Sequence, residues 1–179
     1  MRETIWTIGH SNRDIEEFVA LLREPDIELL VDVRARPRSA RFPHFDEEAL
    51  REALSDAGIT YHWAGRHLGG FRAPSSESPH IALPEGFRGY ADHMQTEVFR
   101  RAIVQLRNLA RRGRTAVMCA EREPLECHRS LIADYLLLEG VQVLHLIGPG
   151  EVREHQLRVE ARRESATLVY DRQVQASLF

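Results

Sequence analysis

The sequence predicts an α/β domain with a mainly parallel sheet of about five strands flanked by helices. Two observations predict this fold class. Short apolar runs alternate with longer segments whose apolar residues recur at helical spacing, and polar residues follow each apolar run. A chain of 179 residues is long enough to bury a sizeable core, so residues 1–179 are expected to form a single domain.

The N-terminal half contains three expected strands and two expected helices. These elements are a strand around Ile5 and Ile8, a helix carrying Ile15, Phe18, Val19, Leu21 and Leu22, a strand over 29–33, a helix from about Phe45, and a strand over 59–63. Ser11 or Asn12 can cap the first helix and Asp46 the second, because short polar side chains accept hydrogen bonds from exposed helical N–H groups. Gly58 is expected to end the second helix.

The C-terminal half continues the alternation after a long irregular segment. Its expected elements are a helix over about 87–112, a strand over 115–118, a helix that begins at Cys-His-Arg (127–129), and a strand over 141–147. The segment 65–86 is rich in Gly, Pro and Ser, and its Leu-Gly-Gly would let it act as a lid. The tail from about residue 151 is expected to be helical to about Glu164, with an edge strand over 167–170.

The composition limits the cellular location and the binding partners that we expect for this protein. The apolar stretches are too short to span a bilayer, and the N-terminus leads directly into a strand, so we expect a cytoplasmic protein with no membrane partner. The net charge of −3 provides no bulk attraction to nucleic acid. All 24 basic residues are arginine, which a codon bias would explain, but clustered arginines would instead form bidentate clamps for anions.

Polar residues gather after each expected strand. In parallel sheets ligands bind beyond the carboxyl ends of the strands, so these residues mark the expected site. In strand order they are His10 and Asn12, then Arg34, Arg36, Arg38 and Arg41, then Trp63, Arg66 and His67, then Cys119 and Glu121, and finally Gly148. Asp32 inside an apolar run would be costly to bury unpaired and is expected to orient an arginine or to cap backbone N–H groups.

The segment 117–130 holds both cysteines of the chain. Cys119 ends a strand, and Cys127-His128-Arg129 starts a helix, where a thiolate, a proton-transfer group and an anion clamp could act together. Alternatively, Cys127 packs as a small apolar residue while the other two cap backbone. The cysteine spacing matches neither a disulfide framework nor a structural zinc site, although a reversible bridge across the loop is conceivable. We expect no metal and no cofactor.

Four motifs in register together resemble the DUF488 family. They are Thr-Ile-Gly-His-Ser-Asn (7–12), Val-Asp-Val-Arg-Ala-Arg-Pro-Arg-Ser (31–39), Tyr-His-Trp…Leu-Gly-Gly (61–70) and Cys-Ala-Glu…Cys-His-Arg (119–129). The resemblance implies a small cytoplasmic α/β domain and no assigned activity. The strand–Cys–loop–helix order is also loosely similar to rhodaneses and cysteine phosphatases. Those enzymes use a short loop, whereas eight residues separate Cys119 from His128 here, so their mechanism is not carried over.

The leading functional hypothesis is an enzyme acting on a phosphate-bearing, nucleotide-like or nucleic-acid substrate. The catalytic candidates are His128 or His10 for proton transfer, Cys127 or Cys119 as nucleophile, and Glu121, which could alternatively hold Arg34 or Arg129 in place. The candidates for substrate binding are Arg34, Arg36, Arg129, Asn12, Trp63, His67, Gly69 and Gly70. The alternatives are a non-catalytic nucleotide or nucleic-acid binding module using the same arginines, and a purely structural role for Cys-His-Arg.

Overall fold

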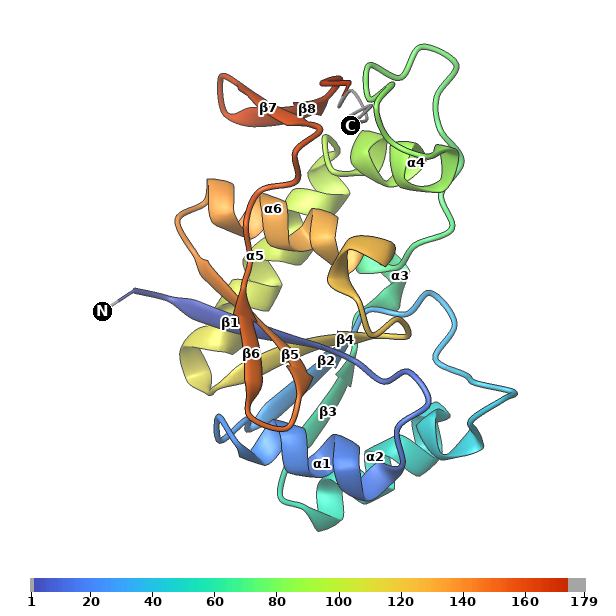
Figure 1. Cartoon of the computed structure of the whole chain (residues 1–179), viewed down its shortest axis with the longest axis vertical. Helices are drawn as coiled ribbons and strands as arrows, with labels where there is room; N and C mark the ends of the chain where they lie inside the picture. The colour runs from blue at the N-terminus through green and yellow to red at the C-terminus, as the bar shows by residue number, and fades with distance from the viewer. Residues whose placement is uncertain (1, 174–179) are drawn as a thin grey trace, which may run out of the picture.

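The computed structural model describes residues 2–173 and has the expected alternation of strands and helices (Figure 1). Its helices are α1 (Ile15–Arg23), α2 (Glu47–Asp56), α3 (Gly65–Leu68), α4 (Glu85–His93), α5 (Glu97–Arg112) and α6 (Arg129–Leu138), with short 3₁₀ turns η1 (Pro43–Phe45) and η2 (Pro124–Glu126). Its strands are β1 (Thr4–Gly9), β2 (Leu29–Asp32), β3 (Thr60–Trp63), β4 (Thr115–Cys119), β5 (Gln142–Gly148), β6 (Glu151–Glu154), β7 (Ala161–Glu164) and β8 (Thr167–Tyr170).

The main sheet has six strands in the order β3-β2-β4-β1-β5-β6. The first five are parallel, and β6 runs antiparallel to β5 at one edge. The expected α/β class with a mainly parallel sheet is therefore confirmed, with one more strand than the sequence indicated. The chain reverses directly after β5 at Gly150, whose φ of 67° is readily adopted by glycine, and the sixth strand then pairs with β5.

Helices cover both faces of this sheet. On one face α1 and α2 pack Phe18, Leu22 and Leu50 onto strand residues of the first core. On the other face α4, α5 and α6 build a second core. Successive residues of β4 alternate between the two cores, so that Met118 joins the first and Cys119 the second. None of the helices in residues 2–173 combines the length and the apolar composition needed to cross a bilayer.

Three local expectations differ from the structure. The helix expected over about 87–112 is two helices, because Thr96 interrupts it and accepts a hydrogen bond from the Phe99 N–H at the start of α5. Asp14, rather than Ser11 or Asn12, caps α1 by accepting from the Glu17 N–H. Asp46 occupies the cap position of α2, yet its carboxylate accepts from the Ser39 N–H at 2.6 Å and stabilises the preceding loop instead.

The expectation of a C-terminal helical tail from about residue 151 is wrong. The tail forms β6, β7 and β8, because backbone pairing with β5 and burial of Tyr170 outweigh the helical propensity of its charged residues. The strand expected over 167–170 is confirmed as β8, which pairs with β7 in a separate two-stranded sheet. Residues 174–179 of the expected tail lie outside the described residues.

The segment 65–86 begins with the short helix α3 and then runs without regular structure to α4. Its contacts attach it to its surroundings. The Asp92 carboxylate accepts from the Ser75 N–H and the Ser78 hydroxyl, and the His80 ring accepts from the Tyr170 N–H. Movement of this segment as a lid stays a prediction.

A buried chain of polar side chains connects the main sheet to the C-terminal hairpin. Asp134 of α6 can only accept, so the His155 Nε2–H donates to it at 2.7 Å and His155 Nδ1 accepts from the His145 Nε2–H at 2.8 Å. His145 Nδ1 then accepts from the Thr7 hydroxyl at 2.6 Å. Burial lowers the pKa of His145 to about 2, which keeps this ring neutral. The Tyr170 hydroxyl donates to the second Asp134 oxygen at 2.9 Å.

Replacing Asp134 with alanine should destabilise the domain by about 3–5 kcal/mol, because His155, Tyr170 and the Arg158 N–H would each lose a buried acceptor. The control Glu139→Ala removes an ion pair with Arg107 from a carboxylate that is 41% exposed, and should cost less than about 1 kcal/mol. Urea unfolding measures the free energy of unfolding of both variants and of the unchanged protein. Equal losses would contradict this role for Asp134.

Candidate functional site

A cavity of about 560 Å³ opens at the carboxyl ends of β2 and β4. This is the sheet edge where the sequence predicts a ligand site. Its walls come from three regions far apart in the sequence, namely the segment after β2, the beginning and end of the segment 65–86, and the segment after β4. Its principal lining residues are Arg34, Arg36, Arg38, Gly70, Phe71, Phe87, Cys119, Glu121, Glu126, Cys127 and His128.

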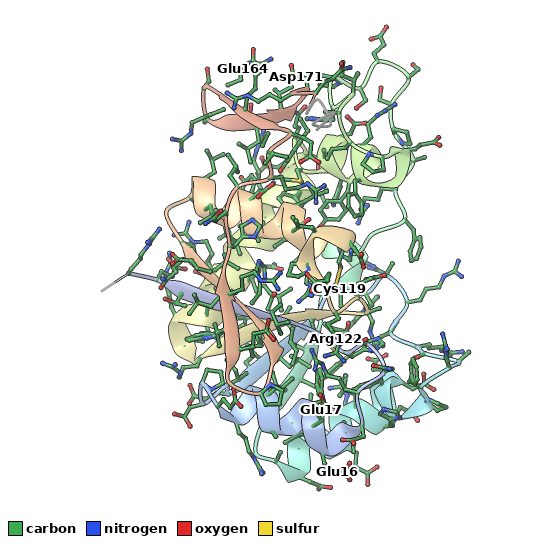
Figure 2. All side chains as sticks on the ribbon, in the orientation of Figure 1. Glu16, Glu17, Cys119, Arg122, Glu164 and Asp171 are labelled. Atoms are coloured by element: carbon green, nitrogen blue, oxygen red, sulfur yellow. A yellow bond between two sulfur atoms is a disulfide. The ribbon has the colours of Figure 1, made fainter. Side chains whose placement is uncertain are left out.

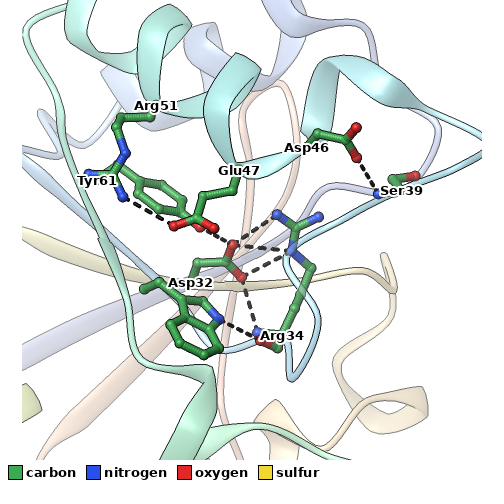
Figure 3. Close-up of polar contacts among 8 residues, drawn as sticks. Asp32, Arg34, Ser39, Asp46, Glu47, Arg51 and Tyr61 are labelled. Atoms are coloured by element: carbon green, nitrogen blue, oxygen red, sulfur yellow. Dashed lines mark hydrogen bonds and ion pairs between the residues drawn. The ribbon is translucent and has the colours of Figure 1, made fainter.

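The position of Arg34 is fixed by Asp32, the last residue of β2 (Figure 3). Asp32 is fully buried, and its carboxylate accepts from the Arg34 N–H and Nε at 3.0 Å and from Nη2 at 2.8 Å. The Tyr61 hydroxyl of β3 donates to the same carboxylate. Burial and the negative charge of Asp32 raise the pKa of Tyr61 well above its usual range, so Tyr61 remains a donor. The expectation that Asp32 orients an arginine is confirmed.

One terminal nitrogen of Arg34 is left without a partner. Nη1 is buried and makes no hydrogen bond to any of the described residues. Figure 3 shows this nitrogen pointing away from Asp32. Because a buried guanidinium N–H without an acceptor is costly, an anion in the cavity would stabilise this arrangement.

Two glycines allow the backbone segments around the site to approach closely. A Cβ atom on Gly9, at the end of β1, would lie 1.7 Å from the Glu121 carbonyl oxygen, and one on Gly65 would lie 1.9 Å from the Arg34 carbonyl oxygen. Neither position can hold a larger residue without moving the backbone. These contacts position the loops that carry Glu121 and Arg34.

The two sulfur atoms of the chain meet in the wall of the cavity. Cys119 comes from the end of β4 and Cys127 from the residues just before α6, and the structure joins them by a disulfide (Figure 2). Both residues are buried. Glu121 Oε2 lies 3.9 Å from Cys119 Sγ, so these two side chains face the same side of the strand end, as the sequence indicated. Donor atoms of Cys119, Glu121 and Cys127 all lie within 4.8 Å of one another.

His128 lies beside the sulfur pair in a fixed orientation. Its Nε2–H donates to the Val33 carbonyl oxygen at 3.1 Å, and Nδ1 lies 3.8 Å from Cys127 Sγ. Burial, together with the nearby positive charge of Arg129, lowers the pKa of His128 to about 4. The ring is therefore neutral at pH 7, with the Nδ1 lone pair next to the sulfur.

His10 lies at the end of β1 and is buried in a neutral form. Its Nδ1 interacts with the Ser11 carbonyl oxygen at 3.0 Å, and its ring stacks on Phe45 with the ring centroids 4.6 Å apart. Burial lowers the pKa of His10 to about 4, and the positive charge of Arg34 adds to this effect. His10 is near the Asp32–Arg34 pair but is not one of the residues that line the cavity.

The expected ligand contact by Arg129 needs correction. Arg129 is fully buried, and its nitrogens donate to the Thr7 hydroxyl and to the carbonyl oxygens of Glu121 and Arg122 at 2.7–2.9 Å. Burial lowers its pKa to about 9, so the guanidinium stays charged at pH 7. Arg129 stabilises the loop that carries Glu121 and does not reach the cavity, because these protein acceptors turn it inward.

The other expected binding residues occupy different places. Asn12 is exposed and accepts a hydrogen bond from Arg122 outside the cavity. Trp63 and His67 line a second cavity of about 270 Å³ between β3, α3 and α5. Trp63 also donates from Nε1 to the Arg34 carbonyl oxygen at 2.8 Å, which supports the Arg34 backbone. Gly69 packs closely against Ala35, whereas Gly70 lines the main cavity.

Sequence reasoning missed two contributors to the cavity wall. Phe87 lies at the start of α4, and Glu126 lies in the 3₁₀ turn η2 between the two cysteines. The sequence placed Phe87 at the start of a helix, and the spacing of apolar residues in that helix does not indicate that Phe87 lines a cavity. Glu126 belongs to the Cys119–Cys127 loop, so its proximity follows once the two sulfur atoms are known to meet.

His10 should remain neutral between pH 8 and pH 5, because burial and the charge of Arg34 oppose its protonation. The unfolded chain protonates this ring near its ordinary pKa of about 6.5. The free energy of unfolding is therefore unaffected by His10 above that pH, and it decreases as the pH falls from about 6.5 toward 4. NMR titration of the His10 ring protons measures the pH at which this ring becomes protonated in the folded protein. The exposed residue His62 serves as the reference within the same spectrum. A midpoint near 6.5 for His10 would contradict the buried environment.

Comparison with known proteins agrees with the resemblance, and three of the four motifs lie within the matched residues, whereas 7–12 precedes them. Residues 14–136 match the sequence model of the family described as "Domain of unknown function DUF488". No curated protein and no solved structure shows significant similarity to the chain. The match covers α1 to α6, with all of the principal residues that line the cavity, and more than half of the chain. The chain belongs to the DUF488 family.

Proposed function

We propose that this protein is an enzyme that binds a phosphate-bearing, nucleotide-like substrate in the cavity at the carboxyl ends of β2 and β4. The single observation that carries the proposal is the Arg34 guanidinium, held by buried Asp32 while Nη1 remains without a partner. A guanidinium fixed in this way is pre-organised for an anion, because its orientation is set before the ligand arrives.

The charges around Arg34 favour an anion with more than one negative charge. Arg36 and Arg38 are exposed and line the same cavity. Three arginines on one wall would bind a phosphate or diphosphate group through charge-assisted hydrogen bonds. Asp32 neutralises part of the charge of Arg34, so the exposed arginines would supply most of the net attraction.

Aromatic residues at the cavity favour a nucleotide over free phosphate. Phe71 is 93% exposed, and its backbone has the positive φ of 60°, which is uncommon for a residue with a bulky side chain. Phe87 lines the same cavity. An exposed aromatic ring close to arginines can stack on a base while the arginines bind its phosphate.

The reacting groups would be those on the opposite wall. Cys119, Cys127, Glu121 and His128 line the cavity together with the arginines. In the dithiol state, Nδ1 of the neutral His128 ring could accept a hydrogen bond from the Cys127 thiol and orient this nucleophile next to the substrate. The expected cytoplasmic location belongs to this proposal, because a reducing compartment keeps thiols available.

A non-catalytic binding module that uses the same arginines is the second candidate function. The observation in its favour is the disulfide between the two sulfur atoms, because bonded sulfurs cannot act as nucleophiles. The two candidates share the anion site and differ in turnover. A nucleotide that binds through Arg34 without being converted by the reduced protein would favour the module.

Arg34→Lys should weaken binding of inorganic pyrophosphate by about tenfold to a hundredfold, because lysine keeps the charge but loses a hydrogen bond worth about 1.5–3 kcal/mol. Isothermal titration calorimetry measures the dissociation constant. Arg101→Lys is the matched control, since Arg101 is 79% exposed on α5 and pairs with Glu97 at 3.4 Å. If both variants bind like the unchanged protein, the anion does not bind at Arg34.

Phe71→Ala should weaken binding of ADP but leave binding of pyrophosphate unchanged. Base stacking on an aromatic ring contributes about 1–3 kcal/mol, whereas the phosphate contacts do not involve this side chain. Val104→Ala, an exposed apolar position on α5, provides the control. A parallel loss for both ligands would show that Phe71 shapes the cavity rather than stacking on a base.

A further inference from the structure

The backbone positions of the two cysteines lie unusually far apart for a disulfide. Their Cα atoms are 7.5 Å apart, whereas the Cα atoms of disulfide-bonded cysteines usually lie about 4.4–6.8 Å apart. A tetrahedral Zn²⁺ lies about 2.3 Å from each thiolate, which separates the two sulfur atoms by roughly 3.7 Å, well beyond the length of an S–S bond. The backbone spacing therefore suits two thiolates bridged by a metal better than a disulfide.

We propose that Cys119, Glu121 and Cys127 bind a thiophilic divalent metal ion, with Zn²⁺ as the typical biological occupant. Three donor atoms of the right chemistry lie within 4.8 Å of one another, and both cysteines are buried at the wall of the cavity. Thiolates and carboxylates are both ligands that zinc uses in proteins. The proposal stands on these side chains alone and does not depend on the anion site.

The surroundings of the three ligands fit a bound metal. Two thiolates, a carboxylate and Zn²⁺ carry a net charge of about −1. The buried guanidinium of Arg129, which donates to the Glu121 carbonyl oxygen, and Arg34 on the facing wall would offset this charge. The loop that carries Glu121 is also fixed by the close approach of Gly9. The ligands are therefore held in place by the fold rather than by the metal alone.

His128 supports this arrangement from the next position in the chain. Its Nε2–H donates to a backbone carbonyl oxygen, which is the contact that metal-binding histidines commonly use to fix their tautomer. The Nδ1 lone pair then lies 3.8 Å from Cys127 Sγ, beside the proposed metal position. Three protein ligands would leave one coordination position for a ligand from the cavity that these residues line, as in catalytic zinc sites.

The state of the thiols provides the first test. Protein purified under argon without chelator is unfolded in guanidinium chloride with EDTA and iodoacetamide, either with or without a reductant, and the cysteine peptides are then weighed. Metal-bound thiols should be alkylated at both positions without a reductant. Alkylation that requires the reductant would show a persistent disulfide and would overturn the proposal.

The second test uses Co²⁺ as a spectroscopic substitute for Zn²⁺. Reduced protein freed of metal should bind one Co²⁺ per chain and show the near-ultraviolet charge-transfer absorption of cobalt–thiolate bonds. Cys119→Ser and Cys127→Ser should each weaken this absorption. Glu121→Gln, at an exposed position where misfolding is not expected, should raise the dissociation constant at least tenfold.

Glu126→Gln is the matched control, because Glu126 is exposed on the same cavity but does not belong to the ligand cluster. It should bind Co²⁺ like the unchanged protein. The proposal is overturned if Co²⁺ does not bind, if it binds without charge-transfer absorption, or if the two glutamate variants behave alike. Neither the alkylation test nor the Co²⁺ test depends on phosphate or nucleotide binding. A negative result in these tests would therefore leave the proposed anion site unaffected.

Discussion

The organisation of the site depends on the buried ion pair between Asp32 and Arg34. A carboxylate without solvent at the end of a central strand is tolerated only because Arg34 and Tyr61 supply hydrogen bonds to both of its oxygens. The pair in turn holds the guanidinium in one orientation at the cavity wall. The nitrogen that Asp32 does not use makes no hydrogen bond to the described residues, and it is the one that the proposed ligand would contact.

The parallel sheet brings the remaining groups to the same place. β2 and β4 are neighbours, so the chain leaves both strands at one edge, and Arg34 and Cys119 face the same cavity. Below this edge, Arg129 connects the loop of Glu121 to Thr7, from which the buried histidine chain continues toward the C-terminal hairpin. The hairpin is therefore linked to the floor of the site by continuous hydrogen bonding, although it is remote in sequence from most of the lining residues.

Much of this arrangement could be predicted from local patterns. The alternation of strands and helices along the chain and the sheet edge at which polar residues gather follow from apolar periodicity. The role of Asp32 follows from the cost of burying a charge. The inward position of Arg129 could not be predicted, because it depends on carbonyl groups that only the folded loop presents. The strands of the tail were missed for a similar reason: their pairing partner β5 and the acceptor Asp134 act through tertiary contacts that outweigh local propensity. The meeting of Cys119 and Cys127 likewise depends on how α6 packs against the sheet.

The central claim is that an anion binds to the free side of Arg34 inside the cavity. A crystal structure of the protein with tungstate, a phosphate analogue with strong anomalous scattering, tests it most directly. We predict an anomalous tungsten peak inside the cavity, placed so that a tungstate oxygen accepts a hydrogen bond from Arg34 Nη1. Tungstate bound only at arginines outside the cavity, with Arg34 Nη1 still lacking an anionic partner, would contradict the account.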